Sequence, residues 1–156
     1  MKAGLMFSAL ALLACTTGPS GSDGNDLAHA FEAVVTTFHS GISEKRREIV
    51  RDQAGWTRLW AEIHAGQTPA EPAPAVDFSQ HMLIVAALGT RPTGGFAVKV
   101  RGVATRGDLL EVAVLETCPP PGAMVTTALT QPVEVVRVPK LPQQPTFMEE
   151  RETSCR

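Results

Sequence analysis

The sequence predicts a single α+β domain: a mostly antiparallel β-sheet, sandwich- or barrel-like, with one amphipathic helix packed on it. The observations behind this prediction are an unbroken apolar run at 82–88, two alternating segments around a turn at 106–108, and an apolar stripe of helical spacing within 52–66. A chain of 156 residues is long enough for one domain with a substantial core.

The composition is that of an ordinary globular protein, with 44% hydrophobic and 19% charged residues. The formal net charge of -2 provides none of the basic surface that nucleic-acid binding requires. We therefore expect no nucleic-acid partner.

The first residues are expected to be a targeting segment. Lys2 precedes an apolar run at 5–14 that is too short to span a bilayer but fits the central part of a signal peptide. The run ends in Leu12-Leu13-Ala14-Cys15, which resembles the lipobox of bacterial lipoproteins. That resemblance implies cleavage before Cys15 and a diacylglycerol on its sulfur. The alternative is a plain secretory signal followed by a chance cysteine.

This interpretation divides the chain into a lipoprotein signal peptide at 1–14, a flexible lipid-anchored tether at 15–28 and a globular domain at 29–156. The lipid implies a bacterial cell-envelope protein that contacts the membrane through Cys15 only. The residue after the cysteine is Thr16 rather than Asp, and an Asp at that position would oppose sorting to the outer membrane. The outer membrane is therefore the favoured location if the cell has one.

The two remaining cysteines are predicted to pair. With Cys15 lipidated, Cys118 and Cys155 form an even pair in an oxidising compartment. A disulfide would tie the C-terminal tail to the proline-rich loop at 119–121. Two free buried thiols are the alternative, and no metal-ligand spacing such as CxxC is present.

The first half of the domain is expected to hold two strands and the helix. β-Branched residues at 31–38 are typical of a strand, Glu48-Ile49-Val50-Arg51 is expected to be a second short strand, and the two are candidates for a hairpin. Asp52 is placed to cap a helix that Gly66 closes.

The apolar stripe of this helix consists of Trp56, Leu59, Trp60 and Ile63. Packing of both tryptophans into the core is favoured over an exposed binding patch.

The second half begins with the run at 82–88, whose branched side chains and short length indicate a strand buried on both faces. The loop at 89–96 follows, with its three glycines and a proline. Segments 96–101 and 110–114 then alternate apolar and polar residues around Arg106-Gly107-Asp108, which predicts a hairpin.

The final segments complete six or seven strands. Residues 117–122 are predicted to form a stiff polyproline-like loop. A strand is expected at 133–138, bounded by prolines, and a final edge strand at 146–148.

Little in the sequence is arranged for catalysis. The four histidines show no HxH or HxxxH spacing, and no GxSxG, phosphate-binding or dinucleotide motif is present. A triad assembled from distant segments stays open, because triads are spatial. We expect a non-enzymatic protein with no catalytic residues, no metal and no cofactor.

The order of several short segments resembles the PrcB-type C-terminal domain, a family of protease-complex subunits. The segments that carry this resemblance are Ser40-Gly41-Ile42, Trp56-Thr57-Arg58-Leu59-Trp60, Val76-Asp77-Phe78-Ser79, the stretch 88–96, Glu116, Pro121-Gly122 and Gln131-Pro132. The resemblance spans 31–149. It implies a secreted or lipid-anchored domain that accompanies and stabilises a surface protease, and it carries over no catalytic residue.

The loop at 90–96 is the candidate protein-binding surface, because a rigid, glycine-rich backbone beside an aromatic ring can meet a partner closely. A structural role for its glycines in a tight loop is the alternative. The residues are Arg91, Pro92, Thr93, Gly94, Gly95 and Phe96. They also resemble a loop of chagasin-type cysteine-protease inhibitors, although the GxGG turn of that family is missing. A protease inhibitor is therefore the alternative function.

Overall fold

The computed structural model describes residues 26–68, 71–152 and 155. The predicted signal peptide at 1–14, Cys15 and the tether as far as residue 25 lie outside the described residues. Within the described part of the chain, no helix has the length and apolar character needed to cross a bilayer.

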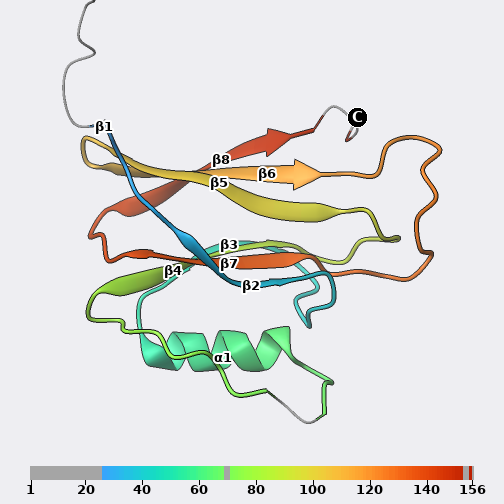
Figure 1. The fold of residues 1–156 in the computed structure, drawn as a ribbon, viewed down its shortest axis with the longest axis horizontal. Coiled ribbons are helices and arrows are strands. Elements are labelled where there is room, and N and C mark those ends of the chain that lie inside the picture. The colour runs from blue at the N-terminus through green and yellow to red at the C-terminus, as the bar shows by residue number, and fades with distance from the viewer. Residues whose placement is uncertain (1–25, 69–70, 153–154, 156) are drawn as a thin grey trace, which may run out of the picture.

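The described chain forms two four-stranded sheets that face each other, with one helix on the outer side of the second sheet (Figure 1). The first sheet is ordered β1 (Asp26–Ala28), β5 (Ala97–Arg106), β6 (Leu109–Thr117), β8 (Gln144–Arg151). The second is ordered β2 (Glu32–Thr37), β7 (Val133–Pro139), β4 (His81–Leu88), β3 (Lys45–Val50), and α1 is Gln53–Ile63. The predicted α+β class in its sandwich form is confirmed, and the sheets do not close into a barrel.

Strand β4 lies at the centre of this arrangement, which explains its unbroken apolar sequence. Side chains alternate across a strand, so Met82, Ile84 and their alternate neighbours pack between the two sheets. Leu83 and Val85 face the other way, toward α1. Both faces of β4 are therefore covered, as the sequence predicted.

Helix α1 begins and packs as its sequence predicts. The Asp52 carboxylate accepts a hydrogen bond from the backbone N–H of Gly55 at 2.7 Å, which caps the first turn. The apolar stripe is buried against β4. Each tryptophan also donates its indole N–H to a backbone carbonyl, Trp56 to Pro74 at 2.9 Å and Trp60 to Glu71 at 2.7 Å. The tryptophans are therefore core anchors that also hold the extended segment after the helix.

The predicted hairpin is confirmed as β5 and β6, which pair from Ala97↔Thr117 to Arg106↔Leu109. Gly107 has φ +58 in the tight turn, a conformation that glycine adopts at little steric cost.

The predicted pairing of the first two strands was wrong. Strand β2 pairs with β7 and β3 pairs with β4, so β2 and β3 form opposite edges of the second sheet. The physical reason is that β4 and β7 are the more apolar strands and take the covered interior positions.

The C-terminal strand occupies an edge, as predicted, but it lies parallel to β6 rather than antiparallel. A parallel neighbour requires a long connection, and β7 in the other sheet lies within that connection.

The predicted boundary between tether and domain at residue 28 also needs correction, because β1 lies within the expected tether. Its residues pair with the end of β5, Asp26 opposite Arg106 and Ala28 opposite Ala104. All three β1 residues are exposed. The contact is therefore made by backbone hydrogen bonds and an exposed ion pair between Asp26 and Arg106 at 3.7 Å, and no apolar pattern predicts it in the sequence.

Candidate functional site

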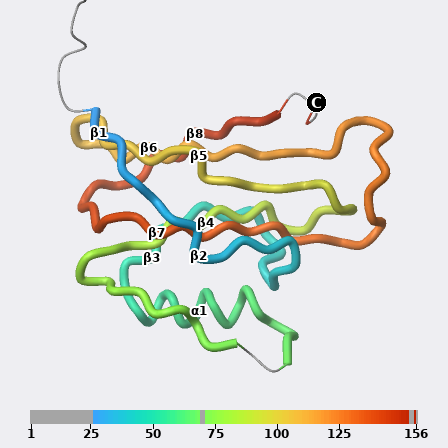
Figure 2. Tube along the Cα trace, in the orientation of Figure 1, coloured from blue at the N-terminus to red at the C-terminus, as the bar shows by residue number. Residues whose placement is uncertain are grey.

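The loop at 89–96 lies at one end of the sandwich, together with the long connection between β6 and β7 (Figure 2). The connection between β2 and β3 reaches the same place, since Thr90 donates its N–H to the Ser43 carbonyl at 2.9 Å. We call this region the loop end.

Backbone hydrogen bonds hold the loop against the β6–β7 connection. Arg91 and Thr130 exchange N–H to carbonyl bonds at 2.7 and 3.0 Å, forming an isolated antiparallel bridge. The Gly94 N–H donates to the Thr126 carbonyl at 3.0 Å, and the Thr130 hydroxyl donates to the Thr93 carbonyl at 2.9 Å. The loop is therefore fixed by contacts within the chain.

Three glycines of the loop are required by the local structure, because a side chain at any of them would overlap a neighbouring group. Gly89 has φ +72, and a Cβ there would lie 2.6 Å from the Ser43 carbonyl oxygen. A Cβ on Gly94 would lie 2.6 Å from the Thr126 hydroxyl oxygen. Gly95 has φ +83 and would bring a Cβ to 2.8 Å from the Pro119 Cβ. The glycines are needed for packing, so a binding role must come from other side chains of the loop.

Arg91 and Phe96 are those side chains. The guanidinium carbon of Arg91 lies 5.8 Å from the centroid of the Phe96 ring, within cation–π range. The Arg91 Nε is buried and has no hydrogen-bond partner in the described residues. No ion pair to Arg91 is formed there either.

Two pockets flank Phe96. An apolar pocket of about 330 Å³ is lined by Phe38, Gly95, Phe96 and Thr126, among others. A more polar pocket of about 200 Å³ is lined by Arg91, Phe96, Glu116, Arg151 and the two cysteines. Phe96 thus lines both pockets.

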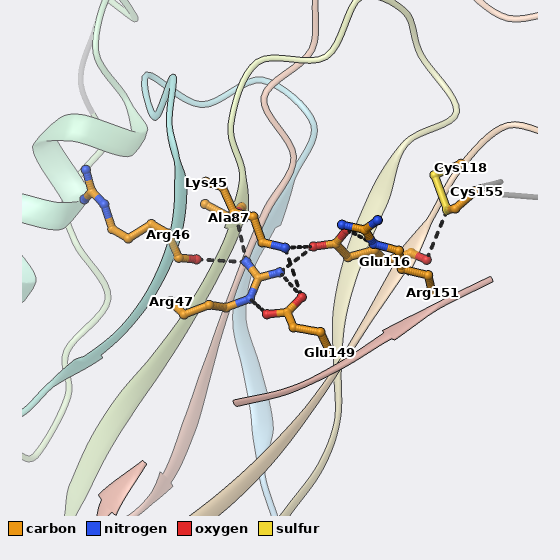
Figure 3. Close-up of polar contacts among 9 residues, drawn as sticks. All are labelled: Lys45, Arg46, Arg47, Ala87, Glu116, Cys118, Glu149, Arg151 and Cys155. Atoms are coloured by element: carbon orange, nitrogen blue, oxygen red, sulfur yellow. Dashed lines mark hydrogen bonds and ion pairs between the residues drawn. A yellow bond between two sulfur atoms is a disulfide. The ribbon is translucent and has the colours of Figure 1, made fainter. Parts of the chain in front are cut away.

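A group of ion pairs adjoins the polar pocket and links the two sheets (Figure 3). Lys45 and Arg47 extend from β3 toward β6 and β8, where they contact Glu116 and Glu149. The Glu116 side chain is 6% exposed and forms an ion pair with Lys45. Its carboxylate also lies 2.9 Å from Arg47 and 3.3 Å from Arg151. We call Lys45, Arg47, Glu116, Glu149 and Arg151 the ionic cluster.

Glu149 is held ionised by this cluster. Burial alone would raise its pKa, but hydrogen bonds from Arg47 and Lys45 outweigh that effect and lower the pKa to about 2. The Arg47 Nε lies 2.8 Å from one Glu149 oxygen and the Lys45 ammonium 3.1 Å from the other.

Arg46, between these two cations, points toward the helix, because neighbouring strand residues face opposite sides (Figure 3). It forms a bidentate pair with Glu62 of α1 at 2.8 and 2.7 Å. That hydrogen-bonded pair raises the pKa of Arg46 and lowers the pKa of Glu62.

The sequence analysis missed the ionic cluster. The available signal was the run of three cations Lys45-Arg46-Arg47, which lies just before the strand predicted at 48–51 and to which no role was assigned.

Cys118 and Cys155, the pair expected to bond, are joined in the structure, with their Cα atoms 5.0 Å apart. The disulfide lies beside Glu116, and the Cys155 sulfur is 3.5 Å from the Glu116 carbonyl oxygen. The tail is thereby attached to the start of the proline-rich connection.

Asp77 and His29, two further polar residues of the described chain, have structural partners. The Asp77 carboxylate accepts hydrogen bonds from the Ser79 hydroxyl at 2.6 Å and the Ser79 N–H at 2.9 Å, which lower the pKa of Asp77. This is a local turn before β4. His29 contacts the Thr105 hydroxyl at 2.7 Å. No group of three or more metal-ligating side chains occurs within the described ranges.

A comparison with protein families matches one segment of the chain. Residues 82–139 match the family described as PrcB C-terminal. The resemblance read from the sequence is thereby confirmed for this segment. No curated protein and no solved structure matches the chain significantly.

The PrcB-like segment runs from β4 to the end of β7 and contains the whole loop, Glu116 and Cys118. Lys45, Arg47 and Glu149 lie outside it. The ionic cluster therefore attaches the flanking strands β3 and β8 to the matched segment.

Proposed function

We propose that this protein is a non-enzymatic, lipid-anchored envelope domain that binds a secreted or surface protease as an accessory, stabilising subunit through its loop end. The supporting observation is the PrcB C-terminal match, which contains the Arg91–Phe96 loop and is consistent with an accessory domain of a protease complex.

The surface of the loop end favours protein binding. Phe38, Met124 and Leu129 belong to its segments and are 50%, 101% and 61% exposed. Exposed apolar side chains that gather in one region are typical of interaction sites. The loop itself is already fixed by hydrogen bonds, so binding would order few additional groups.

The electrostatics of the neighbouring cluster favour a structural rather than a catalytic role. A general base that works near neutral pH needs a pKa near that pH. Glu149 has a pKa of about 2 and is paired with cations. The cluster therefore serves better to join the sheets beneath the binding surface.

The test is affinity capture from native membranes with the full-length chain. We compare the wild type with Phe96→Ala and Phe38→Ala at the loop end, and with Phe31→Ala, a partly exposed aromatic residue beside His81 and Pro139. Urea unfolding verifies that each variant is folded.

We expect the wild type and Phe31→Ala to recover the same protease and to lengthen its half-life at elevated temperature. Recovery should fall about tenfold or more with the loop-end variants, since truncation of a buried aromatic anchor costs about 2 kcal/mol or more. Equal recovery by every variant would contradict the assigned surface. If the captured protease is slowed rather than stabilised, the inhibitor alternative replaces the accessory role.

A further inference from the structure

We infer that Arg91 recognises a carboxylate on the partner's docking segment, while the apolar pocket beyond Phe96 receives an apolar side chain of the same segment. This inference rests on the proposed function and specifies the chemistry of its partner.

Arg91 differs from the other partly buried arginines of the described chain. Those others all have a polar partner for the guanidinium: Arg46 has Glu62, Arg47 has Glu116 and Glu149, Arg51 has the carbonyls of Leu141 and Gln143, and Arg137 has Glu32. The Arg91 guanidinium lies over the Phe96 ring, and its Nε is a buried donor that finds no acceptor among the residues the structure describes.

An unsatisfied buried donor is costly, and an acceptor that reaches it recovers that cost. A carboxylate suits this position, because its two oxygens match the planar N–H fork of a guanidinium. The pocket of about 200 Å³ beside Arg91 is large enough for an acidic side chain.

The charge around the polar pocket also favours an acidic ligand. The residues that line it include two cations, Arg91 and Arg151, and one carboxylate, Glu116, although the whole chain carries a net charge of -2. A local excess of positive charge on an otherwise acidic protein attracts acidic partners.

Phe96 links this polar pocket to the apolar one. Phe96 lines both, and the apolar pocket also includes Phe38 and Gly95. A segment that crosses Phe96 would therefore place an acidic side chain in the polar pocket and an apolar side chain in the apolar one. Residues two apart in an extended segment face the same side, which suits this arrangement.

The experiment is an NMR titration of the purified full-length chain, followed at the side-chain Nε–H signal of Arg91 and, in every variant, at the backbone N–H signals of the loop at 90–96. The probes are the capped peptides Leu-Ala-Asp and Asp-Ala-Leu, each compared with the matched peptide that carries Asn in place of Asp. The variants are Arg91→Gln and, as the control, Arg58→Gln, an exposed helix arginine.

We expect a saturable shift of the Arg91 signal with at least one acidic peptide, and about tenfold weaker binding of its Asn counterpart, since hydrogen bonds to charged groups are the stronger ones. Arg91→Gln should weaken binding of the acidic peptide about tenfold, and Arg58→Gln should leave it unchanged. Arg91→Gln should also unfold at nearly the wild-type urea concentration, because its side chain has no polar partner to lose.

Equal binding of the Asp and Asn peptides, or equal effects of the two variants, would overturn the inference. The outcome is separable from that of the proposed function. If Phe96→Ala abolishes protease capture while Arg91→Gln does not, the accessory role stands and carboxylate recognition fails. If the acidic peptide binds at Arg91 while no protease is captured, carboxylate recognition stands and the accessory role fails.

Discussion

Glu116 is the residue on which the joint between the two sheets depends most. Its carboxylate is buried and paired with Lys45, Arg47 and Arg151. Removing one member of a buried ion pair leaves the opposite charges without compensation, which is strongly destabilising.

We expect Glu116→Gln to lower the free energy of unfolding by about 3 kcal/mol, the lower end of the usual range because Lys45 can turn toward solvent. The control is Glu150→Gln, which removes an exposed charge from β8 and should change stability by less than about 0.5 kcal/mol. Urea unfolding measures both. Similar losses for the two variants would show that net charge, and not the buried pairing, sets the effect.

Glu149 predicts a pH dependence of stability. Its pKa is about 2 in the folded protein, against an ordinary value of 4.5. A lowered carboxylate pKa contributes stability that is fully present above about pH 4.5 and is lost as the pH falls through about 2.

The stability difference between the wild type and Glu149→Gln should therefore be constant at neutral pH and shrink between pH 4.5 and 2. Contributions from Glu62 and Asp77, whose pKa values are also lowered, are present in both proteins and cancel in the difference. A difference that stays the same down to pH 2 would contradict the assigned pairing.

Residue-scale predictions from the sequence were good where the interaction is local. The Asp52 cap and the buried tryptophans follow from neighbours within one or two helical turns. The ionic cluster could not be predicted in the same way, because Lys45 and Glu116 are 71 positions apart and meet only after the sheets pack.

At the element scale, the end of β4 depends on a glycine. Gly89 and Gly107 both have positive φ, +72 and +58. A Cβ at Gly107 would meet nothing within 4 Å, whereas one at Gly89 would meet the backbone of the β2–β3 connection. The two positions therefore separate backbone strain from steric overlap.

We expect Gly107→Ala to cost about 1 kcal/mol, the penalty of the left-handed conformation alone. Gly89→Ala should cost about 1–3 kcal/mol more, because the connection must shift to admit the methyl group. Urea unfolding of the two variants gives the comparison. Equal losses of stability in the two variants would mean that the methyl group at position 89 causes no steric overlap with the β2–β3 connection.

Strand positions were predicted better than strand partners. The alternation in β5 and β6 and the tight turn between them are local signals of a hairpin, and the structure confirms it. The pairing of β2 with β7 brings together segments about a hundred residues apart, and no pattern in either segment predicts which strand it pairs with. The three exposed residues of β1 pair with β5 through the backbone and one exposed ion pair, Asp26 with Arg106, so no apolar pattern predicts this strand.

At the scale of the whole molecule, the sandwich brings three connections to one end, and the PrcB-like segment supplies two of them. The sequence identified the loop at 90–96 as a candidate surface because of its glycine-rich backbone beside Phe96, with a structural role for the glycines as the alternative. The structure shows that those glycines pack internally. The apolar pocket needs Phe38, which lies far from the loop in sequence, so the full surface emerges only from the fold.

The central claim, that the loop end binds a protease, is tested most directly by site-specific photo-crosslinking in the native cell. A benzoyl-phenylalanine replaces Phe38 at the loop end in one strain and Phe31, away from it, in a second strain. The account predicts an adduct that contains a protease from position 38 and none from position 31. A protease adduct from position 31 alone, or no protease adduct from position 38, would contradict it.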